Sequence, residues 1–538
     1  WVENVFRLPF NKYRKEIITK NNTKKEITLF LNKCSQTLDD CIYGHNSAKN
    51  KLLQVIAQNI TNPKPEGIVL GIRGPMGNGK TTLVEKGISK ILNRPFAHVS
   101  LGGAVDSSFL DGHSFTYEGS LWGKIADILM KSQCMNPIIY FDELDKVSGT
   151  YKGEEIINIL IHLVDPSQNK FFQDKYFSGL DLDLSQCIFV FSYNDSSQIN
   201  PILRDRITEI DTKGFKITEK YQIAHKFLLP NILSEVGFSD QNIIIKDSVL
   251  NYIIENYTFE GGVRKLKEKL YELVRELNLR KLKNIPVGKK MIKFPFMINL
   301  ECVKEIFKNI PILTPEKIHD ICQIGKINGL YATSNDTGGL TPIESLEIPS
   351  DSKMQLYLTG NQGKIMKESV EVAKTLSWNI LPQEAKKTME KKWKNSIFTG
   401  LHIHCPEAAT PKDGPSAGTA ITISIVSRLL NVPIYNTVGV TGEIDLSGNV
   451  LEIGGLEHKL YGAKKAGVTK VLCPYQNKKD IDSIKREYPD LIDDKFVVVC
   501  VSNIWEALEH CLVDNNYFFE NHCRKNPGNN NHQIVNKM

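Results

Sequence analysis

The chain contains a serine at the point where a turn meets the expected start of a helix, at Ser416. The preceding residues, 411–415, read PKDGP, which is turn chemistry, and apolar residues recur with helical spacing from Thr419 to Leu430. A helix start offers free backbone N–H groups and the positive end of the helix dipole, and both favour developing negative charge. An isolated serine at such a place is more often an ordinary N-cap, so a nucleophilic role requires a base elsewhere in the chain.

The candidate base is Lys459, in the segment GGLEHKLYGAKK at residues 454–465. If this segment is a helix, one apolar stripe is formed by Leu456, Lys459, Leu460 and Ala463. A lysine on a core-facing stripe either extends to water or is desolvated. Desolvation lowers the pKa of a lysine, and only the neutral amine can accept a proton from a serine. The pattern alone leaves both interpretations open.

A second chemical motif begins after an expected buried strand at residues 68–72, where the sequence reads GPMGNGKT. It fits the phosphate-loop pattern Gly-x4-Gly-Lys-Thr, with a strand before it and a helix after it. The loop's backbone N–H groups would wrap phosphates, Lys80 would reach the outer ones, and Thr81 would ligate Mg²⁺. The predicted nucleotide-binding residues of this loop are Gly74, Pro75, Met76, Gly77, Asn78, Gly79, Lys80, Thr81 and Thr82.

The acidic partners of a phosphate loop are expected at the end of a neighbouring strand, and residues 138–143 read IIYFDE. Asp142 would hold Mg²⁺ through water, and Glu143 would polarise the attacking water. A surface Asp-Glu pair is the alternative, but the four apolar residues before it argue against that. A third apolar run, residues 187–192, leads to Asn194, which would position water near the γ-phosphate. ATP and Mg²⁺ are therefore the expected cofactors.

These motifs resemble those of a known family. PKDGPSAG at 411–418, with VTGEIDLSGNVLEIGGLEHK at 440–459, resembles the proteolytic domain of the Lon proteases, which are ATP-driven serine peptidases with a Ser–Lys dyad. The resemblance implies Ser416 as nucleophile, Lys459 as base and Thr441 as the threonine that supports the lysine. Asp413 matches the acidic residue before the nucleophile. The family usually has a glutamate where this chain has His458, and we expect that change to tune the dyad, not to abolish it.

The resemblance to the AAA+ ATPases, Lon proteases included, implies further nucleotide contacts. It puts the arginine finger, which completes the site of a neighbouring subunit, at Arg206, with Arg204 nearby as a competing candidate. Arg264, after Gly261–Gly262–Val263, would be the lid arginine that senses nucleotide, while Lys265, Lys267 and Lys269 are interpreted as a solvated face. Ile42 and Tyr43 would contact the adenine, although the same stretch could simply be the start of a helix.

Between the phosphate loop and the acid, residues 115–123 read FTYEGSLWG, which is typical of an exposed loop. In AAA+ unfoldases an aromatic residue in such a loop grips the translocating polypeptide. By position in the family pattern Tyr117 is the first candidate and Trp122 the second. The alternative is an aromatic side chain packed against its own helix.

Composition narrows the class of protein. The 538 residues are 41% apolar and 24% charged, which is typical of soluble globular proteins with roughly three domains. A net charge of +6 neither requires nor excludes DNA binding. The 11 cysteines form no Cys-x-x-Cys pair, which predicts reduced thiols in an intracellular protein. No apolar run is long enough to span a membrane.

His402 and His404 share a face of an expected strand, where hydrogen bonding is favoured over metal binding because no third ligand is evident.

The resemblance extends over about residues 1–512 and predicts an α/β protein, an AAA+ P-loop ATPase domain with a helical lid followed by an α/β proteolytic domain. The expected parts are a helical connector (1–39), the large ATPase domain (40–215), the lid (216–310), a linker (311–317), the Lon-type proteolytic domain (318–512) and a disordered tail (513–538). Because the first residue is Trp1, we expect a fragment without the family's amino-terminal substrate-binding domain and without a visible targeting segment.

The function implied by the resemblance is an ATP-dependent serine endopeptidase that unfolds and degrades misfolded or regulatory proteins inside a homo-oligomeric, hexameric chamber. The cytoplasm or the mitochondrial matrix is the expected compartment. The alternative is an ATP-driven unfoldase or a DNA-associated ATPase whose protease-like domain is a non-cleaving scaffold. The presence of both Ser416 and Lys459, and the absence of zinc-finger cysteines, favour the peptidase.

Overall fold

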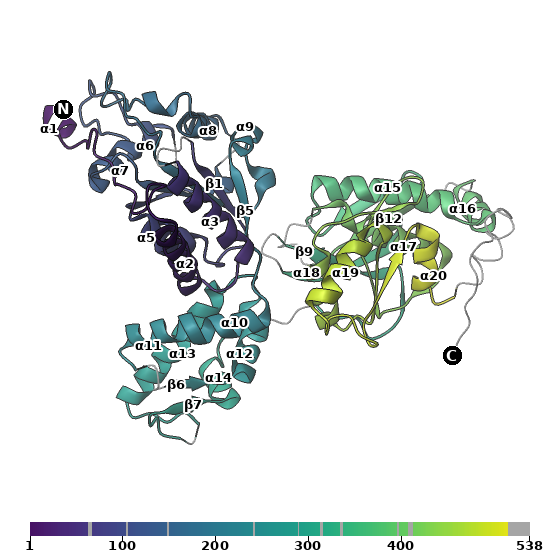
Figure 1. Ribbon diagram of the computed structural model, residues 1–538. Coiled ribbons are helices and arrows are strands. Elements are labelled where there is room, and N and C mark those ends of the chain that lie inside the picture. The colour runs from purple at the N-terminus through teal and green to yellow at the C-terminus, as the bar shows by residue number, and fades with distance from the viewer. Residues whose placement is uncertain are drawn as a thin grey trace. The chain divides into compact units, whose positions relative to one another are not determined.

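The chain folds into two compact units, residues 1–313 and 314–538, and each is described by itself (Figure 1). The computed structural model describes residues 1–514 except 63–66, 104–105, 148–149, 240–242, 289, 313–315, 334–336, 395–397 and 407–412. The predicted tail, except residues 513–514, the middle of the predicted linker, and Pro411 and Lys412 of the serine motif therefore lie outside the described residues.

The first unit is built around a five-stranded parallel sheet with the strand order β2-β3-β4-β1-β5. The strands are β1 (Val69–Arg73), β2 (Phe96–Ser100), β3 (Ile138–Asp142), β4 (Ile188–Tyr193) and β5 (Thr208–Asp211). The three apolar runs predicted as strands are confirmed as the central strands β1, β3 and β4. Because parallel strands end at the same edge of a sheet, the phosphate loop, Asp142 and Asn194 come together there.

Helices cover both faces of this sheet, which explains why its central strands are almost continuously apolar. One face packs against α2 (Lys24–Cys41), α3 (Asn46–Thr61) and the helix that starts at Lys80 and continues through a π-helical segment to Leu92. The other face packs against α6 (Ser108–Asp111), α7 (Lys124–Ser132) and α8 (Tyr151–Val164). The first unit also contains α1 (Val2–Val5) and α9 (Pro201–Asp205).

The amino-terminal helices differ in their bounds from the sequence prediction. α2 starts with a capping box between Thr23 and Glu26 and continues to Cys41, so it crosses the expected connector boundary at residue 39. The helix expected to open at residues 40–44 begins instead at Asn46. Residues 42–45 form the turn between the two helices, and this places Ile42 and Tyr43 on a loop and not on a helix.

Residues 216–310 are mainly helical, and they also contain strands that the sequence analysis did not predict. Its helices are α10 (Ile217–Ile223), which continues through a π-helical turn into α11 (Leu229–Val236), α12 (Asp247–Ile253), α13 (Arg264–Leu282) and α14 (Leu300–Ile306). β6 (Ile243–Ile245) and β7 (Phe296–Ile298) pair in parallel beside them. Three-residue strands are too short to show a period of two, so the apolar residues of β6 were interpreted as part of a helix.

The second unit contains a seven-stranded mixed sheet with the order β11-β12-β10-β9-β14-β17-β18. The strands are β9 (Lys326–Ala332), β10 (Gly338–Pro349), β11 (Leu356–Thr359), β12 (Thr399–His404), β14 (Val438–Val440), β17 (Lys470–Pro474) and β18 (Val497–Val501). One core includes α15 (Lys364–Ile380), α16 (Gln383–Lys394), α17 (Gly418–Leu430) and α20 (Ile504–Cys511), and the other includes α18 (Leu456–Ala466) and α19 (Lys478–Glu487). Two short pairs, β8 (Gln323–Ile324) with β13 (Pro433–Ile434) and β15 (Glu443–Ile444) with β16 (Val450–Leu451), complete it.

The predicted α/β class is therefore confirmed in both units. Throughout the described part of the chain, the helices are either too short or too polar to cross a membrane.

Candidate active sites

A cavity of about 660 Å³ in the first unit brings together most of the residues predicted to bind nucleotide. Its lining includes residues 76–82 of the phosphate loop, Asp142, Glu143, Asn194, Arg264, Ile42 and Tyr43. These residues come from five separate segments of the sequence. Gly74 and Pro75 are not part of the lining; their carbonyl oxygens accept hydrogen bonds from Lys80 Nζ at 2.6 and 3.0 Å.

The phosphate loop is shaped by glycines that no other residue could replace. Gly77 and Gly79 have φ angles of 74° and 91°, in the left-handed region. A Cβ on Gly77 would lie 2.7 Å from the Arg264 side chain, and one on Gly79 would lie 2.5 Å from Ile42. The buried side chain of Asn78 donates to Thr212 Oγ1 at 2.7 Å and so fixes the loop.

The acidic edge of the cavity is held by hydrogen bonds from neighbouring strands. The Ser192 hydroxyl donates to Asp142, and His98 Nε2 lies 3.3 Å from the other oxygen of that carboxylate. Asn194 Oδ1 accepts from Lys80 Nζ at 3.0 Å, and its backbone N–H donates to Asp145 at 3.1 Å. Oxygen donors at Asp142 and Thr81 fit the ligand preference of Mg²⁺.

Two contacts next to the cavity lining were not found from the sequence. His45 Nε2 lies 3.1 Å from the Asn78 carbonyl oxygen, and its ring packs at a tilt against Phe215, with the ring centres 4.8 Å apart. Burial lowers the pKa of His45, so the ring is neutral near pH 7. Phe215 also lines the cavity with Ile42 and Tyr43. His45 has a positive φ of 53°, and this special turn after Gly44 was the signal that could have marked it.

The lid closes one side of the cavity through the start of α13. Val263 N–H donates to the Gly77 carbonyl at 3.0 Å, and a Cβ on Gly262 would lie 2.2 Å from Met76 O. The two glycines before Val263 therefore allow the lid to touch the phosphate loop. Lys267, one turn after Arg264, also lines the cavity, and its side chain is exposed as expected for a solvated face.

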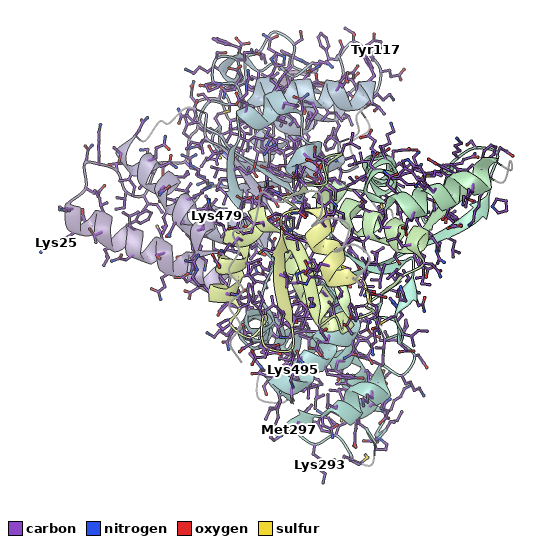
Figure 2. All side chains as sticks on the ribbon, turned by 90° about the vertical axis from the view of Figure 1, so that its right-hand side faces the viewer. Lys25, Tyr117, Lys293, Met297, Lys479 and Lys495 are labelled. Atoms are coloured by element: carbon purple, nitrogen blue, oxygen red, sulfur yellow. The ribbon has the colours of Figure 1, made fainter. Side chains whose placement is uncertain are left out.

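The remaining predicted residues of the first unit lie outside this cavity. Arg206 forms an ion pair with Asp165 at 3.0 Å and donates to the Ile161 carbonyl. Tyr117 is 72% exposed and lies at the outer edge of its unit (Figure 2). Trp122 is half-buried, and its ring stacks on Phe177 at 6.3 Å. The packing alternative therefore describes Trp122, although its partner is Phe177 and not its own helix.

In the second unit, Ser416 lies in a single 3₁₀ turn, Pro415–Ala417, directly before α17. Proline at the first position presets the helical turn, and Gly414 takes a φ of 137° that a residue with a side chain rarely adopts. The Ser416 carbonyl accepts from Gly442 N–H at 2.8 Å, and Thr419 N–H donates to the Gly442 carbonyl at 3.1 Å. The serine turn is therefore tied to the segment that carries Thr441.

Lys459 lies on the buried stripe of α18, as the helical pattern predicted. Its residue is only 4% exposed, and this desolvation lowers its pKa to about 8. Its amine donates to Thr441 Oγ1 at 3.2 Å, and Thr441 Oγ1 lies 3.5 Å from the Ser416 carbonyl oxygen. Thr441 thus joins Ser416 and Lys459. Among the described residues no direct hydrogen bond links Ser416 Oγ with Lys459 Nζ; such bonds often tighten only when substrate binds.

Close packing fixes α18 and with it Lys459. A Cβ on Gly338, at the start of β10, would lie 2.0 Å from the His458 carbonyl oxygen. A Cβ on Gly462 would lie 2.4 Å from the backbone of Gly338. The helix therefore rests directly on the β9–β10 hairpin. His458 is half-buried on this helix next to the lysine.

Asp413 and the histidine pair have structural contacts. Asp413 Oδ1 accepts from Met366 N–H at 3.1 Å, so its carboxylate caps the start of α15.

His402 and His404 each lie within hydrogen-bond distance of Thr359 Oγ1, at 3.0 and 2.7 Å. Within the described ranges no group of three or more His, Cys, Asp or Glu residues could hold a metal ion.

The fold and these two sites define a P-loop ATPase with a helical lid, joined in one chain to a domain with a buried lysine beside a serine turn. Comparison with family models agrees part by part. Residues 70–214 match the ATPase family associated with various cellular activities, residues 234–289 the Lon protease AAA+ ATPase lid domain, and residues 298–514 the Lon protease (S16) C-terminal proteolytic domain. The chain belongs to the Lon protease family.

Curated relatives extend this similarity over most of the chain. A Lon protease homolog of Acanthamoeba polyphaga mimivirus is 37% identical over 91% of this chain and 52% of its own length. The Lon protease of Fervidobacterium nodosum is 36% identical over 94% of this chain and 60% of its own length. A mitochondrial Lon protease homolog of Caenorhabditis briggsae is 32% identical, covering 89% and 52%. The chain thus spans about half to three-fifths of the length of these relatives.

Proposed function

We propose that this chain is an ATP-dependent serine endopeptidase that uses a Ser416–Lys459 dyad. The observation that carries the proposal is the environment of Lys459: a buried amine with a pKa lowered to about 8, hydrogen-bonded to Thr441 beside the serine turn. A buried lysine that has no carboxylate partner among the described residues costs stability, so its presence is explained better by chemistry than by packing.

In the proposed reaction Lys459 acts as general base and then as general acid. The neutral amine takes the proton of Ser416 as Oγ attacks the scissile carbonyl, and the acyl-enzyme forms while the proton passes to the leaving amine. Water then hydrolyses the acyl-enzyme. Thr441 Oγ1 accepts a hydrogen bond from Lys459 and keeps the amine oriented, and N–H groups at the start of α17 are suited to stabilise the oxyanion. Asp413 supports the serine turn by anchoring it to α15.

The nucleotide cavity supports ATP as the energy source. We propose that the phosphate loop binds the phosphates, with Lys80 released from Gly74 and Pro75 to reach them, while Ile42 and Tyr43 contact the base. Thr81 and Asp142 would hold Mg²⁺, which when bound neutralises charge on the phosphates. Glu143 would orient and deprotonate the attacking water with help from Asn194, and Arg264 would report the nucleotide state to the lid.

The proposed assembly is a homo-oligomeric, hexameric ring in which Arg206 completes the neighbouring site. Exposed Tyr117 is suited to grip an unfolded polypeptide, so we propose misfolded or regulatory proteins as substrates. The cysteines resolved as free thiols support an intracellular compartment, cytoplasmic or mitochondrial. The scaffold alternative is not favoured, because the serine turn and the desolvated lysine are both in place.

Degradation of casein by purified full chain tests the proposal. We expect wild type to cleave casein only with ATP, Ser416→Ala to lose cleavage while keeping ATP turnover, and Glu143→Gln to lose both. Ser352→Ala is the matched control, because it removes an exposed serine hydroxyl in the same unit. ATP turnover by wild type without cleavage of casein or of small peptides would contradict the peptidase and favour a scaffold.

A further inference from the structure

Strand β3 carries one hydroxyl in an otherwise apolar run, at Tyr140. The side chain is completely buried, and its ring packs beside Phe96 and His98 of β2 at 5.8 and 5.6 Å. A phenylalanine would fill the same space, so packing alone does not require the hydroxyl. A buried hydroxyl needs a hydrogen-bond partner, and the partner here is Thr81 Oγ1, at 3.2 Å.

The Tyr140 hydroxyl lies among the groups of the proposed magnesium site. The Ser192 hydroxyl and the Asp142 carboxylate lie close to the Tyr140 hydroxyl. Ser192 in turn donates to Asp142 and accepts from Glu143 N–H at 3.4 Å. A phenol is protonated near pH 7, so Tyr140 has one proton to donate and an oxygen to accept a hydrogen bond.

The direction of the Thr81 proton decides whether its oxygen can bind a cation. A threonine hydroxyl that ligates a cation uses a lone pair for it, so its proton must be donated elsewhere. Tyr140 Oη is the acceptor within reach. If Tyr140 instead donated to Thr81, it would use one of the two lone pairs of Thr81 Oγ1, and the Thr81 proton would still need an acceptor elsewhere. The Asp142 carboxylate is a second acceptor near Tyr140 and attracts the phenol proton. Tyr140 Oη is then left to accept the Thr81 proton.

We propose that Tyr140 is a positioning residue of the magnesium–nucleotide site, which accepts the Thr81 proton and keeps a Thr81 lone pair turned toward the cavity. The proposal rests on the nucleotide site of the proposed function and adds a residue that the phosphate-loop pattern does not contain. The same hydroxyl chain, from Thr81 through Tyr140 to Asp142 and Ser192, would couple the two proposed magnesium ligands.

The test is the magnesium dependence of nucleotide binding, measured by titrating the full chain with a fluorescent, non-hydrolysable ATP analogue at graded Mg²⁺ concentrations and in EDTA. In Tyr140→Phe we expect the Mg²⁺ concentration for half-maximal strengthening of binding to rise about tenfold, with affinity in EDTA unchanged. Tyr221→Phe is the matched control, because it removes a tyrosine hydroxyl that bonds Asn251 in the lid at 2.9 Å.

A double-mutant cycle separates positioning from general destabilisation. In a Thr81→Val background Tyr140→Phe should have no further effect on magnesium dependence, since the ligand that it positions is gone. Ser192→Ala gives an independent variant that should also raise the Mg²⁺ requirement. Equal losses with and without Mg²⁺, or additive effects in the cycle, overturn the proposal. If Mg²⁺ does not strengthen nucleotide binding in wild type, the proposed nucleotide site itself is contradicted. If Mg²⁺ does strengthen it and Tyr140→Phe behaves like wild type, only the proposed role of Tyr140 is contradicted.

Discussion

Two lysines in this chain show how surroundings set the role of a residue. Lys80 Nζ donates to three oxygens, the Gly74 and Pro75 carbonyls and Asn194 Oδ1, and these stabilise a charged ammonium. Lys459 is desolvated and donates to one neutral hydroxyl, Thr441 Oγ1. The first environment suits a cation that meets phosphates, and the second suits an amine that loses its proton near neutral pH.

The lowered pKa of Lys459 predicts the pH profile of peptide cleavage. Only the neutral amine can accept the Ser416 proton, and its fraction grows about tenfold per pH unit below the pKa of about 8. We therefore expect kcat/KM for a short peptide to rise steeply from pH 6 to 8 and to level off above pH 8. Stopped assays at constant ionic strength measure it, with ATP turnover of the same samples as the control. A flat profile between pH 6 and 9 would argue against Lys459 as base.

At the scale of elements, the proteolytic site depends on how closely α18 lies on the β9–β10 hairpin. Gly338 and Gly462 face each other, and neither has room for a methyl group. This close contact between α18 and β10 places the Lys459 amine within hydrogen-bond distance of Thr441 Oγ1. Helix register alone would bury the lysine, but this contact fixes its distance from the segment tied to Ser416.

Gly462→Ala should therefore damage peptide cleavage and leave ATP turnover intact. The added Cβ would lie 2.4 Å from the Gly338 backbone, so α18 must shift, at a cost of about 1–3 kcal/mol in unfolding free energy. Gly454→Ala is the control, because its Cβ would meet no atom within 4 Å. Chemical denaturation and peptide cleavage measure the two effects. Wild-type cleavage by Gly462→Ala would show that the close contact does not position Lys459.

The sequence predicted those elements whose apolar pattern is long or tied to a motif. The stripe of α18 and the strands before the phosphate loop and Asp142 were of this kind. The pattern could not predict the β6–β7 pair, because three residues carry too little periodicity. It also missed contacts that exist only after folding, such as Tyr140 with Thr81, 59 residues apart. The exposure of Lys267 was expected from the charge pattern, but its place beside the phosphate loop was not.

At the scale of the whole molecule, the position of Arg206 argues for assembly. Its guanidinium pairs with Asp165 and does not line the nucleotide cavity formed by the described residues of its own chain. The side chain is about one-third exposed, and a partly exposed ion pair of this kind contributes little to stability. In the proposed ring, Arg206 would therefore exchange Asp165 for a phosphate of an adjacent subunit at small cost.

Mixing two inactive variants tests whether Arg206 acts between subunits. Lys80→Ala removes a residue of the cavity, Arg206→Ala removes the proposed finger, and each alone should hydrolyse almost no ATP. In a ring assembled from equal amounts of both, a working site needs an Arg206→Ala subunit beside a Lys80→Ala subunit, so turnover should recover to about a quarter of wild type. Light scattering must first show that the two variants co-assemble. Co-assembled rings without recovered ATP turnover would mean that Arg206 does not act across the interface. In such rings an intact Lys80 and an intact Arg206 would lie in adjacent subunits and still not hydrolyse ATP.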